Sequence, residues 1–199
     1  MARISLTDFV EVVSKSGTPK ASKVAELKNR PKYDPATDFY RPLREHIVEI
    51  HRRGGAKADL KSILSQVTDY KKISNYPGVV NGYRKWWGNK VLEWCDPPTD
   101  VFSAHGIDVS VNPELGLLVD GRPYLIKLYF KSTPLSKQRI DIVTHLMETC
   151  LRPHCKRSET MAVLDTRKSK LLHPTVPTST LAAVVDAELA YIAALWLKL

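Results

Sequence analysis

Residues 107–131 read IDVSVNPELGLLVDGRPYLIKLYFK, and this stretch decides the fold class. Apolar and polar residues alternate over Ile107–Val111, as in a strand with one buried face. Leu115–Val119 is short and apolar, and Tyr124–Phe130 is rich in residues that favour strands. Asp120-Gly121 separates these last two runs and predicts a tight hairpin, because glycine readily takes the positive φ of such a turn. The stretch therefore predicts three consecutive strands of one sheet.

Two charged residues interrupt the apolar pattern of these strands. Glu114 stands directly before the second run, and Lys127 lies inside the third. Lysine is rarely buried without a partner, so Lys127 either lies on an exposed face or pairs with a carboxylate. Because a hairpin joins the two runs, the side chains of Glu114 and Lys127 could face each other.

Downstream of the strands the sequence predicts a helix, a strand and a closing helix. Ser136 begins a helix over Lys137–Leu151, and Thr160–Leu164 is a buried strand followed by an edge strand at Leu171-Leu172. Ser179–Leu197 is apolar around most of its circumference, which indicates deep packing or a contact between two copies of the chain. It is the basis of an alternative function, a non-catalytic interaction or structural protein that self-associates as a homodimer.

The residues before the sheet read as helical, so the fold class is predicted to be α+β. Helices are indicated near residues 5–17, 18–27, 37–53 and 59–67. Ser5 and Asp8 fit a capping pattern for the first helix, and Pro42 is tolerable only in a first turn, which indicates a start later than Thr37 for the third. Pro77 is expected to open a further helix that ends at Trp87, with Trp87 buried. A candidate domain boundary near residue 90 separates a helical region, 1–90, with a helix-turn-helix-like order, from a mixed sheet flanked by helices, 91–199.

The composition is that of a globular protein with an excess of positive charge. Lys and Arg number 30 against 21 Asp and Glu, which gives a net charge of +9. Such an excess favours a nucleic-acid partner, because cationic side chains neutralise phosphates and release counterions. The charge is spread over every quarter of the chain, so it does not locate the binding surface, and solubility is the alternative explanation.

Location and redox state follow from the apolar runs and the cysteines. No run approaches the roughly 18 apolar residues that span a bilayer, and MARISLTDFV lacks an apolar signal core. We therefore expect a cytoplasmic protein without a membrane partner. The cysteines, Cys95, Cys150 and Cys155, are odd in number, which argues against a disulfide framework.

The order of predicted elements resembles the core of the PD-(D/E)XK nuclease-like superfamily. From Pro77 to Leu172 the chain is expected to run helix, three strands, helix, strand (αβββαβ). In that superfamily an acidic residue at the start of the second core strand and an acid-x-lysine motif on the third bind Mg²⁺ and activate water. The resemblance places Pro113-Glu114 at the first motif and Lys127 at the lysine of the second. It implies Mg²⁺-dependent cleavage of nucleic acid.

The second motif is incomplete in this chain. Leu125 stands two positions before Lys127, where the superfamily has a carboxylate. Mg²⁺ takes oxygen ligands, so Glu114 alone would be a poor site, and Asp108 or Glu93 is the candidate for the missing ligand. We take Glu114, Asp108 and Lys127 as catalytic candidates, with Glu114 and Asp108 as the metal ligands. The alternative is a structural cross-strand pair of Glu114 with Lys127.

Three groups of cationic residues are candidates for phosphate contacts. One lies near the tryptophans that end the helix before the sheet, and one lies in a charged turn after the 160–164 strand. The third lies at the start of the 137–151 helix, where backbone N–H groups also attract phosphate. The residues are Arg84, Lys85, Lys137, Arg139, Arg167, Lys168 and Lys170.

Overall fold

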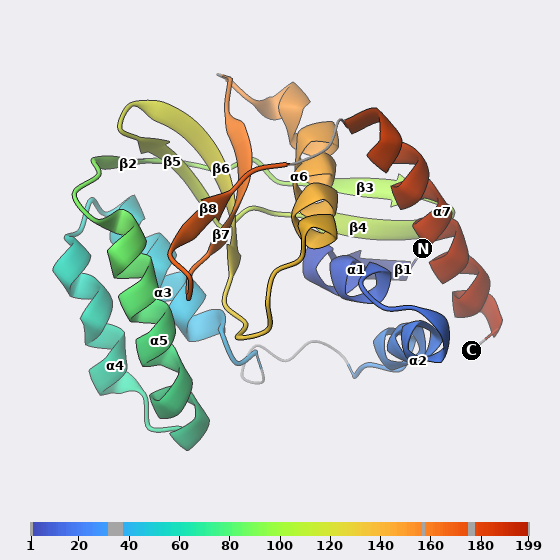
Figure 1. The fold of residues 1–199 in the computed structure, drawn as a ribbon, viewed down its shortest axis with the longest axis horizontal. Helices are drawn as coiled ribbons and strands as arrows, with labels where there is room; N and C mark the ends of the chain where they lie inside the picture. The colour runs from blue at the N-terminus through green and yellow to red at the C-terminus, as the bar shows by residue number, and fades with distance from the viewer. Residues whose placement is uncertain (1, 32–37, 157, 175–177, 199) are drawn as a thin grey trace.

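A computed structural model describes residues 2–31, 38–156, 158–174 and 178–198, and it confirms the predicted α+β class (Figure 1). The helices are α1 (Leu6–Val13), α2 (Gly17–Lys28), α3 (Arg41–Arg52), α4 (Ser62–Gln66), α5 (Tyr70–Trp87), α6 (Lys137–Leu151) and α7 (Thr178–Lys198), with 3₁₀ turns η2 (Lys57–Lys61) and η3 (Arg152–His154). The strands are β1 (Ala2–Ser5), β2 (Leu92–Cys95), β3 (Asp100–Ala104), β4 (Ile107–Val111), β5 (Leu115–Val119), β6 (Arg122–Tyr129), β7 (Thr160–Asp165) and β8 (Lys170–Leu172).

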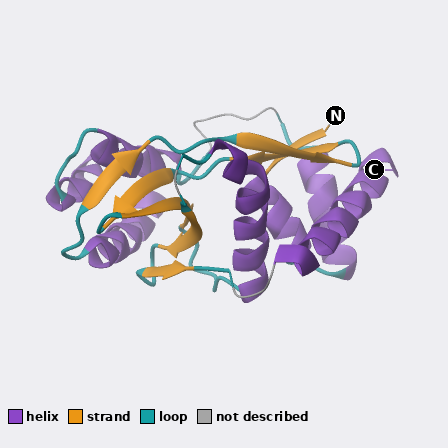
Figure 2. Cartoon of the chain, turned by 90° about the horizontal axis from the view of Figure 1, so that it is seen from above, coloured by secondary structure: helices purple, strands orange, loops and turns teal. Residues whose placement is uncertain are grey.

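The strands form two separate sheets, one on each side of α6 in Figure 2. The larger sheet has the order β2-β5-β6-β7-β8, in which β6 and β7 are parallel and the other neighbours antiparallel. The smaller sheet has the order β1-β4-β3, in which β1 runs parallel to β4. The larger sheet and its helices thus follow the order helix, three strands, helix, strand through α5, β2, β5, β6, α6 and β7.

The prediction that Ile107–Val111 joins the next two strands is wrong. This strand, β4, has β3 on one edge and β1 on the other, so neither edge is free for β5. Leu92–Cys95 takes its place beside β5. Alternation of apolar and polar residues identifies a strand, but it does not identify the partner of that strand.

The prediction of a wholly helical start is wrong for Ala2–Ser5, which form β1. Four residues are too few to show the alternation of apolar and polar residues that marks a strand. The partner strand is also distant in sequence, since Ala2 pairs opposite Ile107. The predicted helix cap beside it is confirmed, because the side chain of Ser5 accepts a hydrogen bond from the N–H of Asp8 at 3.0 Å.

Helix α5 begins at Tyr70, and the prediction that Pro77 opens it is wrong. The side chain of Asp69 caps the helix by accepting from the N–H of Lys72 at 2.9 Å, and Pro77 lies inside. A proline inside a helix removes one backbone hydrogen bond, and the buried side of α5 offsets that loss. The buried tryptophan is Trp86, at 5% exposure, instead of Trp87.

Strand β6 separates two hydrophobic cores, because its two faces contribute side chains to different cores. Leu125 faces a core made with α1, α2, α6, α7 and the smaller sheet, whereas Ile126 and Leu128 face a core made with α3, α4 and α5. The first core combines residues 4–27 with residues 107–192, and the second combines 43–86 with 115–164. The domain boundary near residue 90 stays a prediction, and each core takes segments from both sides of it.

Helix α7 confirms the predicted helix and packs on α2, α6 and the smaller sheet. By length and composition alone, Thr180–Lys198 could cross a membrane, with a mean hydropathy of 1.6 and 22% of it buried. The expectation that no segment is apolar enough to span a bilayer is wrong by this measure. Asp186 and Glu188 interrupt the apolar run, but the mean hydropathy of the segment stays high enough for a candidate span. Core helices of soluble proteins share this composition, so the lack of a membrane partner stays a prediction.

Candidate functional site

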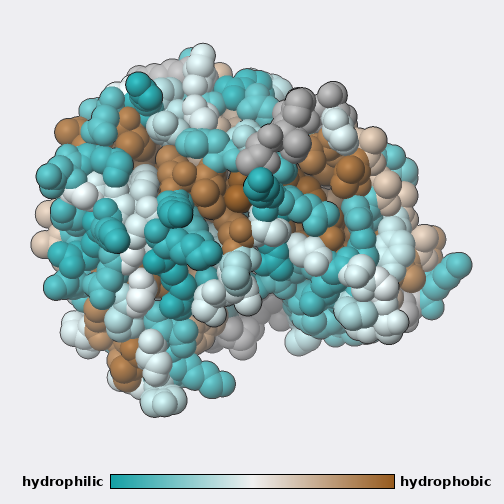
Figure 3. Space-filling view, viewed as in Figure 1, coloured by the Kyte–Doolittle hydropathy of each residue, from teal (hydrophilic) through white to brown (hydrophobic). Residues whose placement is uncertain are grey.

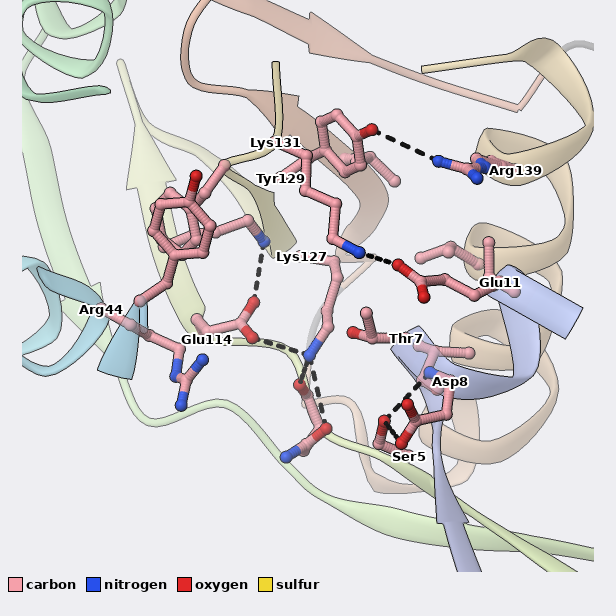
Figure 4. Close-up of a pocket in the computed structure, with 18 of the residues that line it drawn as sticks. Ser5, Thr7, Asp8, Glu11, Arg44, Glu114, Lys127, Tyr129, Lys131 and Arg139 are labelled. Atoms are coloured by element: carbon pink, nitrogen blue, oxygen red, sulfur yellow. Dashed lines mark hydrogen bonds and ion pairs between the residues drawn. The ribbon is translucent and has the colours of Figure 1, made fainter. Parts of the chain in front are cut away.

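A pocket of about 840 Å³ lies where β6 meets α1 and the first turns of α6 (Figure 4). Its residues include Tyr129 and Lys131 at the carboxyl end of β6, and Arg139 near the start of α6. β6 and β7 are parallel here and α6 connects them. Ligands of open α/β sheets bind outside the carboxyl ends of parallel strands, so the position favours a binding site.

The structure brings Glu114 and Lys127 together in this pocket. The Nζ of Lys127 donates to Oε1 of Glu114 at 2.7 Å, to the carbonyl of Asn112 at 2.8 Å and to its Oδ1 at 3.4 Å. The other oxygen of Glu114 accepts from the N–H of Leu128 at 2.7 Å. Both charged side chains are 11% exposed. Every donor of Lys127 and each oxygen of Glu114 is therefore already hydrogen-bonded within the chain.

The structure does not bring Asp108 to this pair. Asp108 lies on β4 of the smaller sheet, where its Oδ1 accepts from Oγ of Ser103 at 2.7 Å, and it is not among the residues that line the pocket. Leu125 is 2% exposed and Glu93 is on β2, at the far side of β5. Within the described ranges, no group of three or more His, Cys, Asp or Glu side chains could hold a metal.

These donors do not suit Mg²⁺, which takes six oxygen ligands in near-octahedral geometry. Glu114 would have to release Lys127 or the N–H of Leu128 to become a ligand, and Asp108 would have to leave its own sheet. Catalysis by Glu114, Asp108 and Lys127, and the Mg²⁺ that it needs, stay predictions.

The other charged residues of the pocket were not predicted from the sequence; they come from α1, from the residues after α2 and after β6, and from the start of α3 with the residues before it. Arg30 donates through both Nη atoms to Asp8 at 3.0 and 2.8 Å, Arg44 pairs with Asp38 at 2.8 Å, and Lys131 pairs with Glu11. Burial raises the pKa of the Asp8 carboxyl, but hydrogen bonds from Arg30 and Ser5 outweigh burial and lower it overall. Only the Ser5–Asp8 cap was visible in the sequence.

Arg139 lies in the pocket, apart from most of the other predicted phosphate contacts. Its Nε donates to Oγ of Ser14 at 2.8 Å and its Nη1 to the hydroxyl of Tyr129 at 3.3 Å. Lys131 lies on the other side of the Tyr129 ring in Figure 4. Burial, and then the charge of Arg139, lower the pKa of Lys131. Lys137 is exposed at the first position of α6.

The remaining predicted phosphate contacts come together on one surface, formed by α5 and the turn between β7 and β8. Oγ of Ser169 donates to the carbonyl of Gly82 at 2.8 Å, although the two are 87 positions apart in sequence. Nη2 of Arg167 reaches Oδ1 of Asn75 at 3.2 Å. We call this surface the basic face; its cationic residues are Lys71, Lys72, Arg84, Lys85, Arg167, Lys168 and Lys170.

The basic face contains almost no negative charge. α5 carries four cationic residues and no acidic one, and the turn over residues 166–170 also has none. Asp165 is 2% exposed, and its carboxylate accepts from the N–H of Lys168 at 3.0 Å. Asp69, the cap of α5, is exposed beside Lys71 and Lys72 at the start of the helix, so the part of the face without an exposed carboxylate is the Arg84 end of α5 with the 166–170 turn. Figure 3 shows mainly hydrophilic and neutral side chains over α5.

No family model, curated protein or solved structure matches this chain. The resemblance to the PD-(D/E)XK nuclease-like superfamily stays a prediction that rests on element order, Glu114 and Lys127. Function is therefore inferred from the side chains of the chain itself.

Proposed function

We propose that the protein binds nucleic acid through the basic face and contacts the phosphate backbone. The observation that carries the proposal is the close packing of two cationic segments, α5 and the 166–170 turn, with no exposed carboxylate in either. Clustered cations attract a polyanion and gain free energy from counterion release, whereas cations paired with carboxylates gain much less. We expect the protein to act in the cytoplasm.

The exposed side of α5 suits close approach of a phosphate chain. Lys71, Ser74, Gly78, Asn81 and Lys85 are all exposed and follow one another at intervals of three or four residues, so they share one side of the helix. The two lysines are about 21 Å apart along the axis at 1.5 Å per residue. Between them the side chains are small and uncharged, which lets a backbone lie close to the helix.

The proposal does not include phosphodiester hydrolysis. Each oxygen of Glu114 accepts a hydrogen bond from the chain, and Leu125 fills the position of the second carboxylate. In this proposal the pair of Glu114 and Lys127 is structural and holds the segment before β5 against β6. Support comes from the bond of Lys127 to Asn112 in the same segment.

Removing two exposed lysines of the basic face should weaken binding. We expect Lys85→Ala/Lys168→Ala to lower affinity for duplex or single-stranded DNA at least about tenfold at low salt. The slope of log affinity against log salt concentration should fall by about 2 for a duplex, roughly one for each lost phosphate contact. Fluorescence anisotropy across a salt series, with a labelled duplex and a labelled single strand, measures both quantities.

The matched control removes the same charge elsewhere. Lys156 and Lys198 are exposed, and Lys198 ends α7, on the opposite side of the molecule from α5 in Figure 1. Lys156→Ala/Lys198→Ala should leave affinity and salt slope close to wild type. Equal losses in both double variants would show a response to net charge alone, and no binding by the wild type at low salt would reject the proposal.

Self-association through α7 is the second candidate function. Val184 and Tyr191 are each 37% exposed and Leu197 is 88% exposed, all on the side of α7 that the chain leaves uncovered among the described residues. Exposed apolar residues on one helix favour a contact with another protein surface. A second copy of the chain would bring the same residues to the contact.

Charge on this side of α7 should prevent such a dimer. We expect the wild type to be dimeric by light scattering at about 100 µM, a range in which weak dimers form. Val184→Glu/Tyr191→Glu should be monomeric at the same concentration, with an unchanged circular dichroism spectrum. A monomeric wild type would remove this candidate.

A further inference from the structure

We propose that the pocket between β6, α1 and α6 binds a small organic monoanion. Its charged group would lie between Lys131 and Arg139, and its apolar body would lie against α1 and α6. The site is separate from the basic face and takes a different class of ligand.

Size and lining suit a small molecule. The pocket volume of about 840 Å³ falls within the range of about 300–1,000 Å³ that is usual for such sites. Apolar side chains from α1, β7, α6 and the segment before α6 form a large part of its wall. They are Leu6, Val10, Leu135, Val143 and Val163.

Among the described residues that line the pocket, one cationic side chain has no acidic partner. Five of these lining residues are cationic and four are acidic. Asp8, Glu11, Asp38 and Glu114 each pair with a different cation of the set, Arg30, Lys131, Arg44 and Lys127. Arg139 is the fifth cation, and its hydrogen bonds go to hydroxyl groups.

Arg139 is held in place with a donor to spare. The hydroxyl of Ser14 accepts from its Nε and the hydroxyl of Tyr129 accepts from its Nη1. Among the described residues none accepts from Nη2, so this donor is available to a ligand. A guanidinium fixed in this way binds a planar or tetrahedral anion with little loss of side-chain entropy. An anion beside it would also offset the repulsion from Arg139 that contributes to the lowered pKa of Lys131.

The same acidic residues argue against a polyanion in this pocket. Of the described residues, four carboxylates line it: Asp8 and Glu11 from α1, Asp38 from the segment before α3 and Glu114 from the segment before β5. A nucleic-acid backbone or a polyphosphate would bring several negative charges close to them, at a large electrostatic cost. A single negative charge next to Arg139 neutralises the one excess positive charge of the described lining residues, and the rest of the ligand packs against the apolar side chains of the pocket.

Two fluorescent probes with the same apolar body test the proposal. 1-Anilinonaphthalene-8-sulfonate carries one negative charge, and N-phenyl-1-naphthylamine is its neutral counterpart. We expect Arg139→Gln to weaken binding of the sulfonate at least about tenfold, because it loses a charge-assisted hydrogen bond, and to change binding of the neutral probe less than about twofold. Fluorescence titration of the full chain measures both affinities.

Control variants separate the pocket from other surfaces. Arg3 also donates its Nε to a serine hydroxyl, that of Ser110 at 2.9 Å, but it lies outside the pocket, so Arg3→Gln should leave both affinities unchanged. Leu135→Trp should fill the pocket and weaken both probes. If Arg139→Gln fails to fold by circular dichroism, Lys131→Gln serves as the second charge variant with the same expected pattern.

Two results would overturn the proposal. One is sulfonate binding that survives Arg139→Gln and Leu135→Trp but is lost in Val184→Ser/Tyr191→Ser, which would place the probe on α7. The other is a failure of both benzoate and benzenesulfonate, each with one negative charge, to displace the bound probe. Displacement by either supports the proposal, and the stronger competitor identifies the anionic group as a carboxylate or a sulfonate.

Discussion

Replacing Lys127 with methionine should destabilise the protein by about 3–5 kcal/mol, because Glu114 would stay buried without its counter-charge. The two side chains are 11% exposed and joined at 2.7 Å, so water screens them poorly. Methionine keeps the length and most of the volume of lysine, so packing changes little. Urea unfolding monitored by tryptophan fluorescence measures the loss.

A second variant separates the lost pair from other causes. Lys127→Met/Glu114→Gln removes both charges and keeps an oxygen that accepts from the N–H of Leu128, so it should recover part of the lost stability. The double-mutant cycle then gives the coupling energy of Glu114 with Lys127. A loss below about 1 kcal/mol in the single variant would mean that the pair behaves like an exposed one.

The same variant tests the catalytic alternative. If the wild type cleaves DNA in Mg²⁺ or Mn²⁺ and Lys127→Met retains its fold but loses cleavage, the pair belongs to an active site. We expect no cleavage by the wild type and a destabilised variant.

Gly82→Ala should cost about 3 kcal/mol and weaken nucleic-acid binding as well. A Cβ at this position would lie 1.9 Å from the carbonyl oxygen of Thr166 and 3.1 Å from Cα of Arg167. These are backbone atoms, so α5 and the turn between β7 and β8 would have to move apart. The basic face would then lose its shape. Thermal unfolding and the anisotropy titration measure the two effects.

Gly78 offers a matched control four residues earlier on the same helix. A Cβ there would meet Nη1 of Arg167 at 3.0 Å, which is the end of a flexible side chain. Alanine also favours a helix over glycine by about 1 kcal/mol. Gly78→Ala should therefore be neutral or stabilising and should still bind nucleic acid. Similar losses in Gly78→Ala and Gly82→Ala would show that the contact with Thr166 has no special role.

Local hydrogen bonds made several helices predictable. Ser136 stands before an apolar pattern over Lys137–Leu151, and the structure gives this helix the same bounds with the Ser136 side chain as its cap. Pro42 indicated that the helix near residues 37–53 starts late, and α3 starts at Arg41. In both cases the residues that set the helix start are close to it in sequence.

Long-range pairing was not predictable in the same way. Ile107–Val111 is a strand, as expected, but its partners Ala2–Ser5 are too short to show a pattern. Pro77 is a strong signal for a helix start, and the cap at Asp69 together with buried Tyr76 and Val80 overrides it.

The candidate sites differ in the same way: one depends on residues close in sequence, and the other two depend on long-range packing. The contact of Glu114 with Lys127 follows from a hairpin, which the sequence contains. The basic face depends on Gly82 meeting Thr166, and the pocket depends on α1 lying beside β6, so neither is visible in the residues nearby. Asp8 could be read only as part of a helix cap, and Glu11 only as part of an amphipathic helix.

The parallel pairing of β1 with β4 has a consequence for synthesis on the ribosome. Residues of β1 and α2 have partners far downstream: Ala2 pairs opposite Ile107, and Lys20 donates to Glu188, 168 positions later. Contacts between distant segments form slowly, and domains otherwise tend to fold from the N-terminus as they emerge. In this protein the middle of the chain, α3 to β6, can pack before α6 is made, whereas the apolar side of α1 packs on α6. A nascent chain would therefore expose part of that side until α6 has emerged, and an exposed apolar surface of this kind binds chaperones.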